Sequence, residues 1–150
     1  MVEWGILALL LLVFIGVFGH YARIVQGQAE RASVMTTLGA LRTALVVAHV
    51  QSRVQGAPLA STLPSNPFLT LDAPPTNYAG EKSVLESLEA PLGSWVYDPQ
   101  CACVGYLPRY PQWLDSPSDA FALWFKMKTG TGAPELVAMD RYIWQGLQVD

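Results

Sequence analysis

The chain has 150 residues, a formal net charge of −3 and a mean hydropathy of +0.27, with 51% hydrophobic and only 14% charged residues. This length suits one domain plus an anchoring segment, and the lack of a basic cluster excludes the electrostatic footprint of a nucleic-acid-binding protein. Residues 61–150 hold five basic and ten acidic side chains, whereas residues 20–60 hold four arginines and one glutamate. We therefore expect a basic stalk that carries an acidic head.

The N-terminal stretch from Trp4 to Phe18 is apolar throughout, and residues 4–22 contain no Asp, Glu, Lys or Arg. A helix needs roughly 20 such residues to cross a bilayer. We therefore predict a transmembrane helix over residues 1–22. A cleaved secretory signal is an alternative, although it would have a basic n-region and a small-residue cleavage site. A buried core helix is another.

The next segment, residues 23–56, has the pattern of an amphipathic helix. Apolar side chains recur at spacings of three and four, as on one helical face, and Met35 to Ala48 is the longest such stripe. Polar residues, among them Glu30, Arg31 and Arg42, fall on the other face. All eleven prolines lie after residue 57. One helix over about residues 3–54 is therefore predicted, ended by Gly56-Ala57-Pro58.

Residues 57–150 are predicted to form the globular head, which begins with a proline-rich loop from Leu59 to about Pro91. Proline and glycine at this density argue against a continuous strand or a long helix. A short helix over Glu81 to Glu89 is the one regular element expected there. Four side chains should hold the loop against the head: Phe68, Leu69, Leu71 and Tyr78.

Four short aromatic and β-branched segments then predict strands: Ser94–Tyr97, Cys103–Leu107, Phe121–Lys128 and Leu136–Met139. Asp98-Pro99-Gln100-Cys101 has proline where a type I turn favours it, which predicts a hairpin between the first two. In the third, Phe121, Leu123, Phe125 and Met127 alternate with a wetter face. The predicted fold is α+β, a long N-terminal helix packed on a small antiparallel β-sheet.

A hydrophobic helix with Glu3 near its start, continuing as an amphipathic stalk onto a small sheet, resembles the type IV pilins and type II secretion pseudopilins. The motifs NPF at Asn66–Phe68, PPTNYAGE at Pro74–Glu81 and GSWVYD at Gly93–Asp98 are similar to sequences of pilin-like proteins of Gram-negative bacteria. The resemblance covers the whole chain in architecture.

This resemblance implies a non-enzymatic, single-pass subunit of the bacterial inner membrane with its head in the periplasm. It implies partners that include other pilin-like subunits in a filament and an inner-membrane assembly platform. Glu3 matches the glutamate that pairs with a neighbouring subunit, and a carboxylate at the edge of a bilayer requires a partner or the wet headgroup layer. Assembly would involve Glu3, Gly5, Leu10, Phe14 and Gly16, the glycines allowing close approach of helices.

Two features depart from the family pattern. The start Met1-Val2-Glu3-Trp4 lacks the basic leader and Gly-Phe junction of the family, so we expect either an incomplete start or an unprocessed protein. Arg23 and Arg31 would favour a cytoplasmic location for the stalk under the positive-inside rule. A non-polymerising membrane-anchored module whose head binds a protein in the periplasm is therefore the alternative function.

The two cysteines, Cys101 and Cys103, allow a disulfide in an oxidising compartment, but a Cys-x-Cys bridge closes a small ring. We therefore favour two separate thiols. A closed zinc site requires four ligands, and both histidines, His20 and His49, belong to the long helix, so no metal or other cofactor is expected.

The head shows no catalytic pattern, because neither histidine lies near a nucleophile of this region. Asp115 and Asp119, which flank Pro117, are a minor candidate for calcium binding. The aromatic side chains of the head are expected in the core and interfaces more than in a ligand platform, with Trp113 exposed. These residues are Trp95, Tyr97, Tyr106, Tyr110, Trp113, Trp124, Tyr142 and Trp144.

Overall fold

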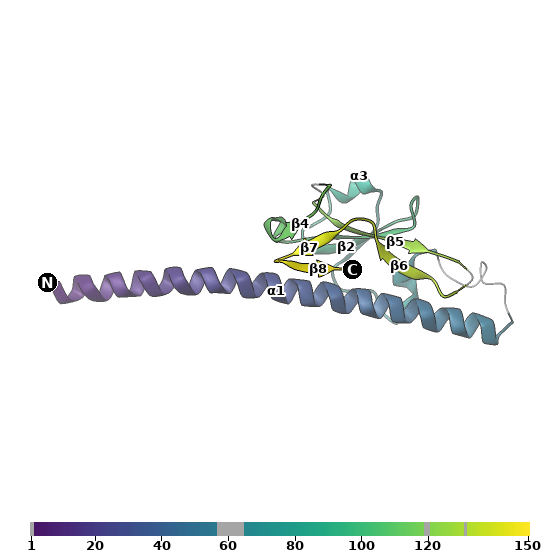
Figure 1. Cartoon of the computed structure of the whole chain (residues 1–150), viewed down its shortest axis with the longest axis horizontal. Coiled ribbons are helices and arrows are strands. Elements are labelled where there is room, and N and C mark those ends of the chain that lie inside the picture. Colours follow the sequence, from purple (N-terminus) through teal and green to yellow (C-terminus); the bar gives the residue numbers. More distant parts are fainter. Residues whose placement is uncertain (1, 57–64, 119–120, 131) are drawn as a thin grey trace.

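The computed structural model describes residues 2–56, 65–118, 121–130 and 132–150. Its dominant element is α1, one helix of 53 residues from Val2 to Val54, and a small head packs on its C-terminal half (Figure 1). Gly56 has a left-handed φ of 67° just after the helix ends. The predicted helix over about residues 3–54 is confirmed, whereas Ala57 and Pro58 lie outside the described residues.

The head contains a five-stranded sheet in the order β1-β2-β3-β5-β6. The strands are β1 (Tyr78–Glu81), β2 (Ser94–Asp98), β3 (Cys103–Leu107), β5 (Leu123–Lys128) and β6 (Glu135–Ala138). β1 runs parallel to β2, and the other neighbours are antiparallel. The predicted hairpin between β2 and β3 is confirmed, with Ser94 opposite Leu107 and Asp98 opposite Cys103.

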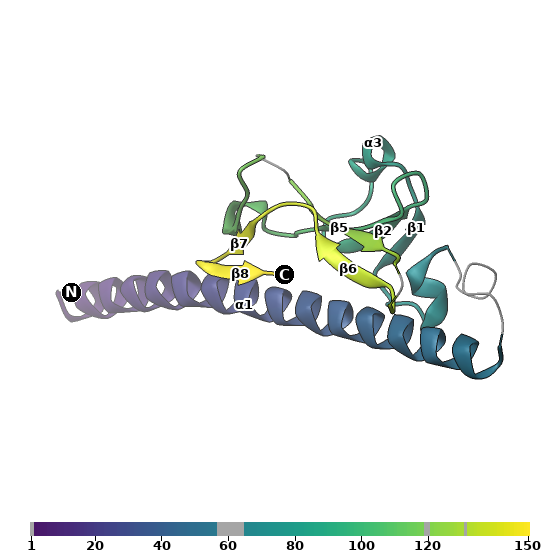
Figure 2. The ribbon, with the colours of Figure 1, turned by 45° about the vertical axis from the view of Figure 1, so that its right-hand side comes forward.

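A second sheet of three short antiparallel strands lies beside the five-stranded sheet, next to the middle of α1 (Figure 2). It consists of β4 (Leu114–Asp115), β7 (Tyr142–Trp144) and β8 (Leu147–Val149). Two one-turn 3-10 helices, η1 (Pro67–Thr70) and η2 (Pro111–Trp113), and the short helix α3 (Val84–Ser87) complete the head.

The main core lies between the buried stripe of α1 and the sheets. The stripe consists of Val34, Leu38, Leu41 and Leu45, which are almost completely buried. They belong to one cluster with side chains of the sheets and of η1, including Phe68, Trp95, Val104, Leu123, Phe125, Tyr142 and Trp144. Burial of apolar area on both partners is the principal force that fixes the head on the helix. The predicted α+β class, with the helix covering the dry face of the sheet, is confirmed.

The expectation that residues 59–91 contain no continuous strand leaves room for one short strand, β1, whereas the prediction of a purely antiparallel sheet is wrong. β1 lies in this region, and Trp95 N donates to Asn77 O over 2.9 Å at the start of its parallel pairing with β2. Gly80 has a φ of 91°, and the register shifts within the strand. Proline and glycine therefore limit the strand to four residues without preventing it. The helix expected over Glu81–Glu89 is only one turn long.

Two side chains expected in the interior, Phe121 and Leu69, are exposed, whereas Met127 is partly buried against the main core. Phe121 precedes β5, which begins at Leu123, so strand alternation does not set its direction. The face of β5 that was expected to be wetter has exposed Lys126 and Lys128 and is covered only at its start. Its Trp124 packs on a second, smaller core formed by Ala90, Val96, Leu107 and Ala122.

Candidate functional site

The N-terminal part of α1 extends away from the head, and its side chains from Glu3 to Phe18 are exposed (Figure 1). By length and composition, α1 has one segment that is apolar enough to cross a membrane, with a mean hydropathy of 2.2. A core helix passes the same test but would be buried, whereas none of this segment is buried within the chain. A signal sequence near the N-terminus also passes it. The segment is therefore compatible with a membrane anchor.

The predicted assembly residues divide between two faces of this segment. At about 100° per residue, Glu3, Leu10 and Phe14 fall within roughly 40° of one another, and Gly5 and Gly16 lie on the opposite side. No atom lies within 4 Å of a Cβ built at either glycine. The same projection places these glycines on the side of α1 that faces the head further along. α1 thus has one face with bulky apolar side chains and one carboxylate. Its opposite face has two positions without a side chain, Gly5 and Gly16.

The head is joined to α1 by hydrogen bonds as well as by its core. Arg31 Nη2 donates to Gln148 O, and the two terminal nitrogens of Arg42 donate to Asp150 O and Leu136 O, each over 3.1 Å. These bonds attach α1 to β8 and to the outer edge of β6. Both arginines belong to the polar face of α1, and their long side chains reach the head from beside the buried stripe.

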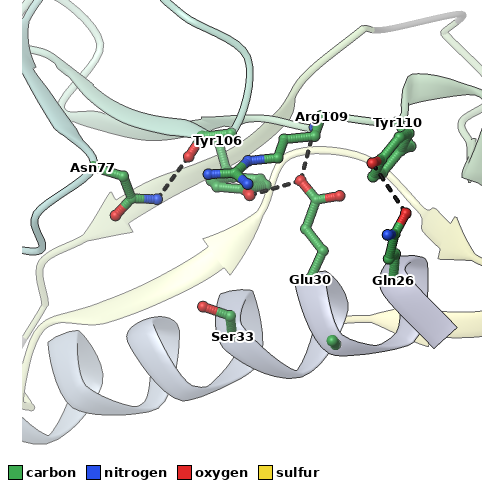
Figure 3. A pocket seen from close by; sticks show the side chains of 9 residues that line it. Gln26, Glu30, Ser33, Asn77, Tyr106, Arg109 and Tyr110 are labelled. Carbon is green, nitrogen blue, oxygen red and sulfur yellow. Dashed lines mark hydrogen bonds between the residues drawn. The ribbon is translucent and has the colours of Figure 1, made fainter. Parts of the chain in front are cut away.

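Glu30 forms the centre of a second polar contact (Figure 3). Its Oε1 accepts hydrogen bonds from Tyr106 OH over 2.8 Å and from Arg109 N over 2.7 Å. Burial, followed by the hydrogen bond to Glu30, raises the pKa of the Tyr106 hydroxyl well above its ordinary value of 10.0. One turn earlier, Gln26 Oε1 accepts from Tyr110 OH over 3.2 Å.

These residues border an open hollow of about 370 Å³ between α1 and the head (Figure 3). Glu30 Oε2 is buried without a hydrogen-bond partner among the described residues. On the opposite wall, Asn77 Nδ2 donates to Gly93 O over 2.7 Å. A Cβ at Gly93 would lie 2.5 Å from Arg109 Nε, so glycine is needed where the arginine crosses the chain. The arrangement is a polar joint between helix and head, at a residue that the sequence assigned to the polar face of α1.

One sequence signal could have located this joint. Glu30 is four residues before Val34, so it lies on the same helical face as the buried stripe. It is also the sole acidic residue between residues 20 and 60. An acidic side chain in line with an apolar stripe predicts a donor on the opposing surface, because a carboxylate is rarely buried without one. The tyrosine and backbone amide that supply the donors could not be identified from spacing.

Cys101 and Cys103 are joined by a disulfide, with their Cα atoms 5.2 Å apart. The favoured expectation of two separate thiols is therefore wrong. That expectation rested on the small ring that a Cys-x-Cys bridge closes. In the structure Cys101 precedes β3, which begins at Cys103, and Ala102 between them has a left-handed φ of 54°. This turn brings the two cysteines closer than consecutive same-face positions of a strand, which lie about 6.6 Å apart.

No group of three or more histidine, cysteine or acidic side chains is arranged to bind a metal in the described part of the chain. Asp119, half of the possible calcium site, lies outside the described residues, and Asp115 is exposed in β4. Among the acidic loop residues, Asp140 has a lowered pKa, because it accepts hydrogen bonds from Ser118, from the Arg141 backbone and from Ser116. His49 is buried in α1.

The aromatic side chains mostly form the core. Trp95, Tyr97, Tyr142 and Trp144 are at most 2% exposed. Trp113, which was expected in solvent, is partly buried against this core. It packs beside α1 where Gly27 allows close approach, since a Cβ there would lie 3.2 Å from Trp113 Cδ1 and would overlap the Gln145 side chain. Gln145 in turn donates to Ile24 O over 3.3 Å, which attaches the turn between β7 and β8 to α1.

Comparisons with models of protein families, with curated proteins and with solved structures give no match for this chain.

Proposed function

We propose that this protein is a pilin-like structural subunit, or a minor component, of a type IV pilus or a type II secretion pseudopilus. The observation that carries the proposal is that the two halves of α1 have different surroundings. One unbroken helix leaves its apolar N-terminal segment without any contact to the head and uses its C-terminal half as part of the head's core. Such a helix suits a subunit that is held in a membrane and then packs beside other helices.

In this proposal, the protein is a single-pass protein of the bacterial inner membrane with its head in the periplasm. The apolar segment from Trp4 to Phe18 exchanges lipid for neighbouring subunits during assembly. Its two faces support this role, because the bulky side chains of Leu10 and Phe14 on one copy have small positions, Gly5 and Gly16, to pack against on another. The assembly platform of the inner membrane would supply the other contacts.

Glu3 has the most specific role in the proposal. A carboxylate beside an apolar segment is costly to bring between packed helices unless a positive group or a donor meets it. A neighbouring subunit would supply that partner only in the assembled state. Loss of this carboxylate should therefore impair assembly more than insertion into the membrane.

The test compares Glu3→Ala with Glu89→Ala, which removes an exposed carboxylate from the head and serves as the control. Each variant is produced with the assembly machinery, and membrane-bound and sheared filament fractions are quantified by immunoblot. We expect Glu3→Ala to remain in the membrane and to disappear from the filament fraction, whereas Glu89→Ala resembles the parent. Normal incorporation of Glu3→Ala would contradict the proposed role.

The alternative is a non-polymerising anchored module that binds another protein. Mass spectrometry of the mature N-terminus separates the two functions. A trimmed and N-methylated terminus supports the filament subunit, and an unprocessed Met1 supports the anchored module.

A further inference from the structure

The short helix α3 and the turn after it pack on the head in an unusual orientation. The residues that face the protein are small or polar: Ser87 is 3% exposed and Ala90 is 7% exposed. The large apolar residues face outward, with Leu85, Leu88 and Leu92 exposed by 79%, 67% and 59%. Val84 beside them is also exposed. A surface helix normally has the opposite arrangement.

Several contacts fix this orientation. Ser83 and Glu86 form a reciprocal capping box at the start of α3, and Asp98 Oδ2 accepts a hydrogen bond from Val84 N over 3.1 Å. Ser87 Oγ donates to Val84 O over 2.6 Å, and Ala90 belongs to the smaller core. The leucines are therefore held in solvent by a well-bonded segment, and a slight rotation of the turn would not bury them without breaking these bonds.

We propose that Val84, Leu85, Leu88 and Leu92, here named the α3 surface, are a docking site for a segment of another protein that carries apolar side chains flanked by Lys or Arg. Contiguous exposed apolar residues rimmed by polar groups mark interaction sites in soluble domains. α3 lies on the side of the five-stranded sheet that faces away from α1 (Figures 1 and 2). The site stays accessible whatever α1 packs against, so this inference does not rest on the proposed filament function.

Charge determines which occupant fits. α3 and the turn after it contain two exposed glutamates, Glu86 and Glu89, with one basic residue, Lys82, just before them. An apolar surface with an acidic rim is complementary to apolar side chains with a basic rim. A second copy of the head fits poorly, because residues 61–150 have twice as many acidic as basic side chains. Anionic lipid would be repelled for the same reason.

The probe is a library of short random peptides displayed on phage, selected against the immobilised full-length protein in detergent. We expect the enriched peptides to combine leucine or aromatic residues with Lys or Arg, as in amphipathic segments that bind apolar grooves. The double variant Leu85→Ser, Leu88→Ser should weaken binding of the best peptide by at least about tenfold. The matched control Leu147→Ser, which changes an exposed leucine of β8, should leave binding unchanged.

Thermal unfolding of the double variant should match that of the parent, because both leucines are exposed, and this separates loss of binding from loss of fold. Glu89→Lys should weaken the basic peptides and leave the fold intact. The proposal is overturned if no peptide is enriched, if acidic peptides are selected, or if binding survives the double variant. It is also overturned if the double variant abolishes self-association of the parent in sedimentation experiments, since a second copy would then be the occupant.

Discussion

Leu41→Ala and Leu10→Ala make the same chemical change at two positions of α1 and should have very different effects on the head. Leu41 is fully buried in the core beneath the sheet, whereas Leu10 is 52% exposed in the apolar N-terminal segment. If α1 serves as core in one half and as an external surface in the other, only the first change should destabilise the head.

The size of the effect follows from burial. Leu-to-Ala changes at fully buried sites cost about 2–5 kcal/mol, because apolar contacts are lost and a cavity remains. Leu41 belongs to a cluster that includes side chains from both sheets and η1, so limited relaxation is expected and a value of about 3 kcal/mol is reasonable. At about 4 °C per kcal/mol for a domain of this size, Tm should fall by roughly 12 °C. The Leu10 variant should keep the parental Tm.

The assay is thermal unfolding of the full chain in detergent, followed by near-ultraviolet circular dichroism. This signal reports on the buried Trp95 and Trp144 and not on the helical content of α1. The reasoning would be refuted if the two variants lowered Tm equally, or if Leu41→Ala left Tm unchanged. Either result would mean that the stripe of α1 does not form the core of the head.

Three further predictions concern single contacts. Glu30→Ala removes the acceptor of Tyr106 OH and Arg109 N and should lower the free energy of unfolding by about 2–4 kcal/mol; denaturant unfolding measures this, with Glu89→Ala as control. Gly105→Ala would place a Cβ 2.6 Å from Trp124 Cζ3 and should cost about 1–3 kcal/mol, whereas Gly130→Ala, with open space around it, should not. The raised pKa of Tyr106 means that the folded state favours the neutral phenol. The neutral Tyr106 side chain therefore makes its full contribution to the free energy of unfolding below pH 10, and this contribution declines as the pH rises above 10. The free energy of unfolding of the Tyr106→Phe variant should therefore decline less steeply above pH 10 than that of the parent. An unchanged slope in denaturant unfolding measured across this pH range would contradict this.

The helix and the order of the main strands could be predicted because each is specified by local patterns. α1 combines apolar periodicity with the absence of proline, and β2 and β3 are separated by a recognisable turn. The strands missed from sequence are the short ones. β1, β4, β7 and β8 have only two to four residues each, too few for alternation to distinguish them from loop. These segments form strands because they pair with partners that are distant in sequence or that follow a tight turn. β6 is equally short, but the apolar run Leu136–Met139 made it recognisable.

The polar joint was missed for a different reason. The sequence divided α1 into an apolar face and a polar face, and it placed the charged residues on the polar face. In the structure, Glu30, Arg31 and Arg42 flank the buried stripe, and each satisfies hydrogen-bonding groups of the head that the stripe leaves uncovered. A helix covered by a sheet has such boundary positions on both sides, and side chains there are long enough to reach the partner. Periodicity alone cannot show which charged side chains of the helix reach the sheet.

The two surfaces that are proposed to bind other molecules differ in the charged side chains that they offer to a partner. Charged side chains of α1 between residues 30 and 42 bond to the head, so they are not available to a neighbour. What α1 offers outward is its apolar N-terminal segment, which suits lipid or another apolar helix. The α3 surface differs because its leucines alternate with the exposed glutamates Glu86 and Glu89, which suits a basic soluble partner. An assembly defect from Glu3→Ala and a binding defect from the α3 variants should therefore be independent, and a variant that combines them should show both defects without either enhancing the other.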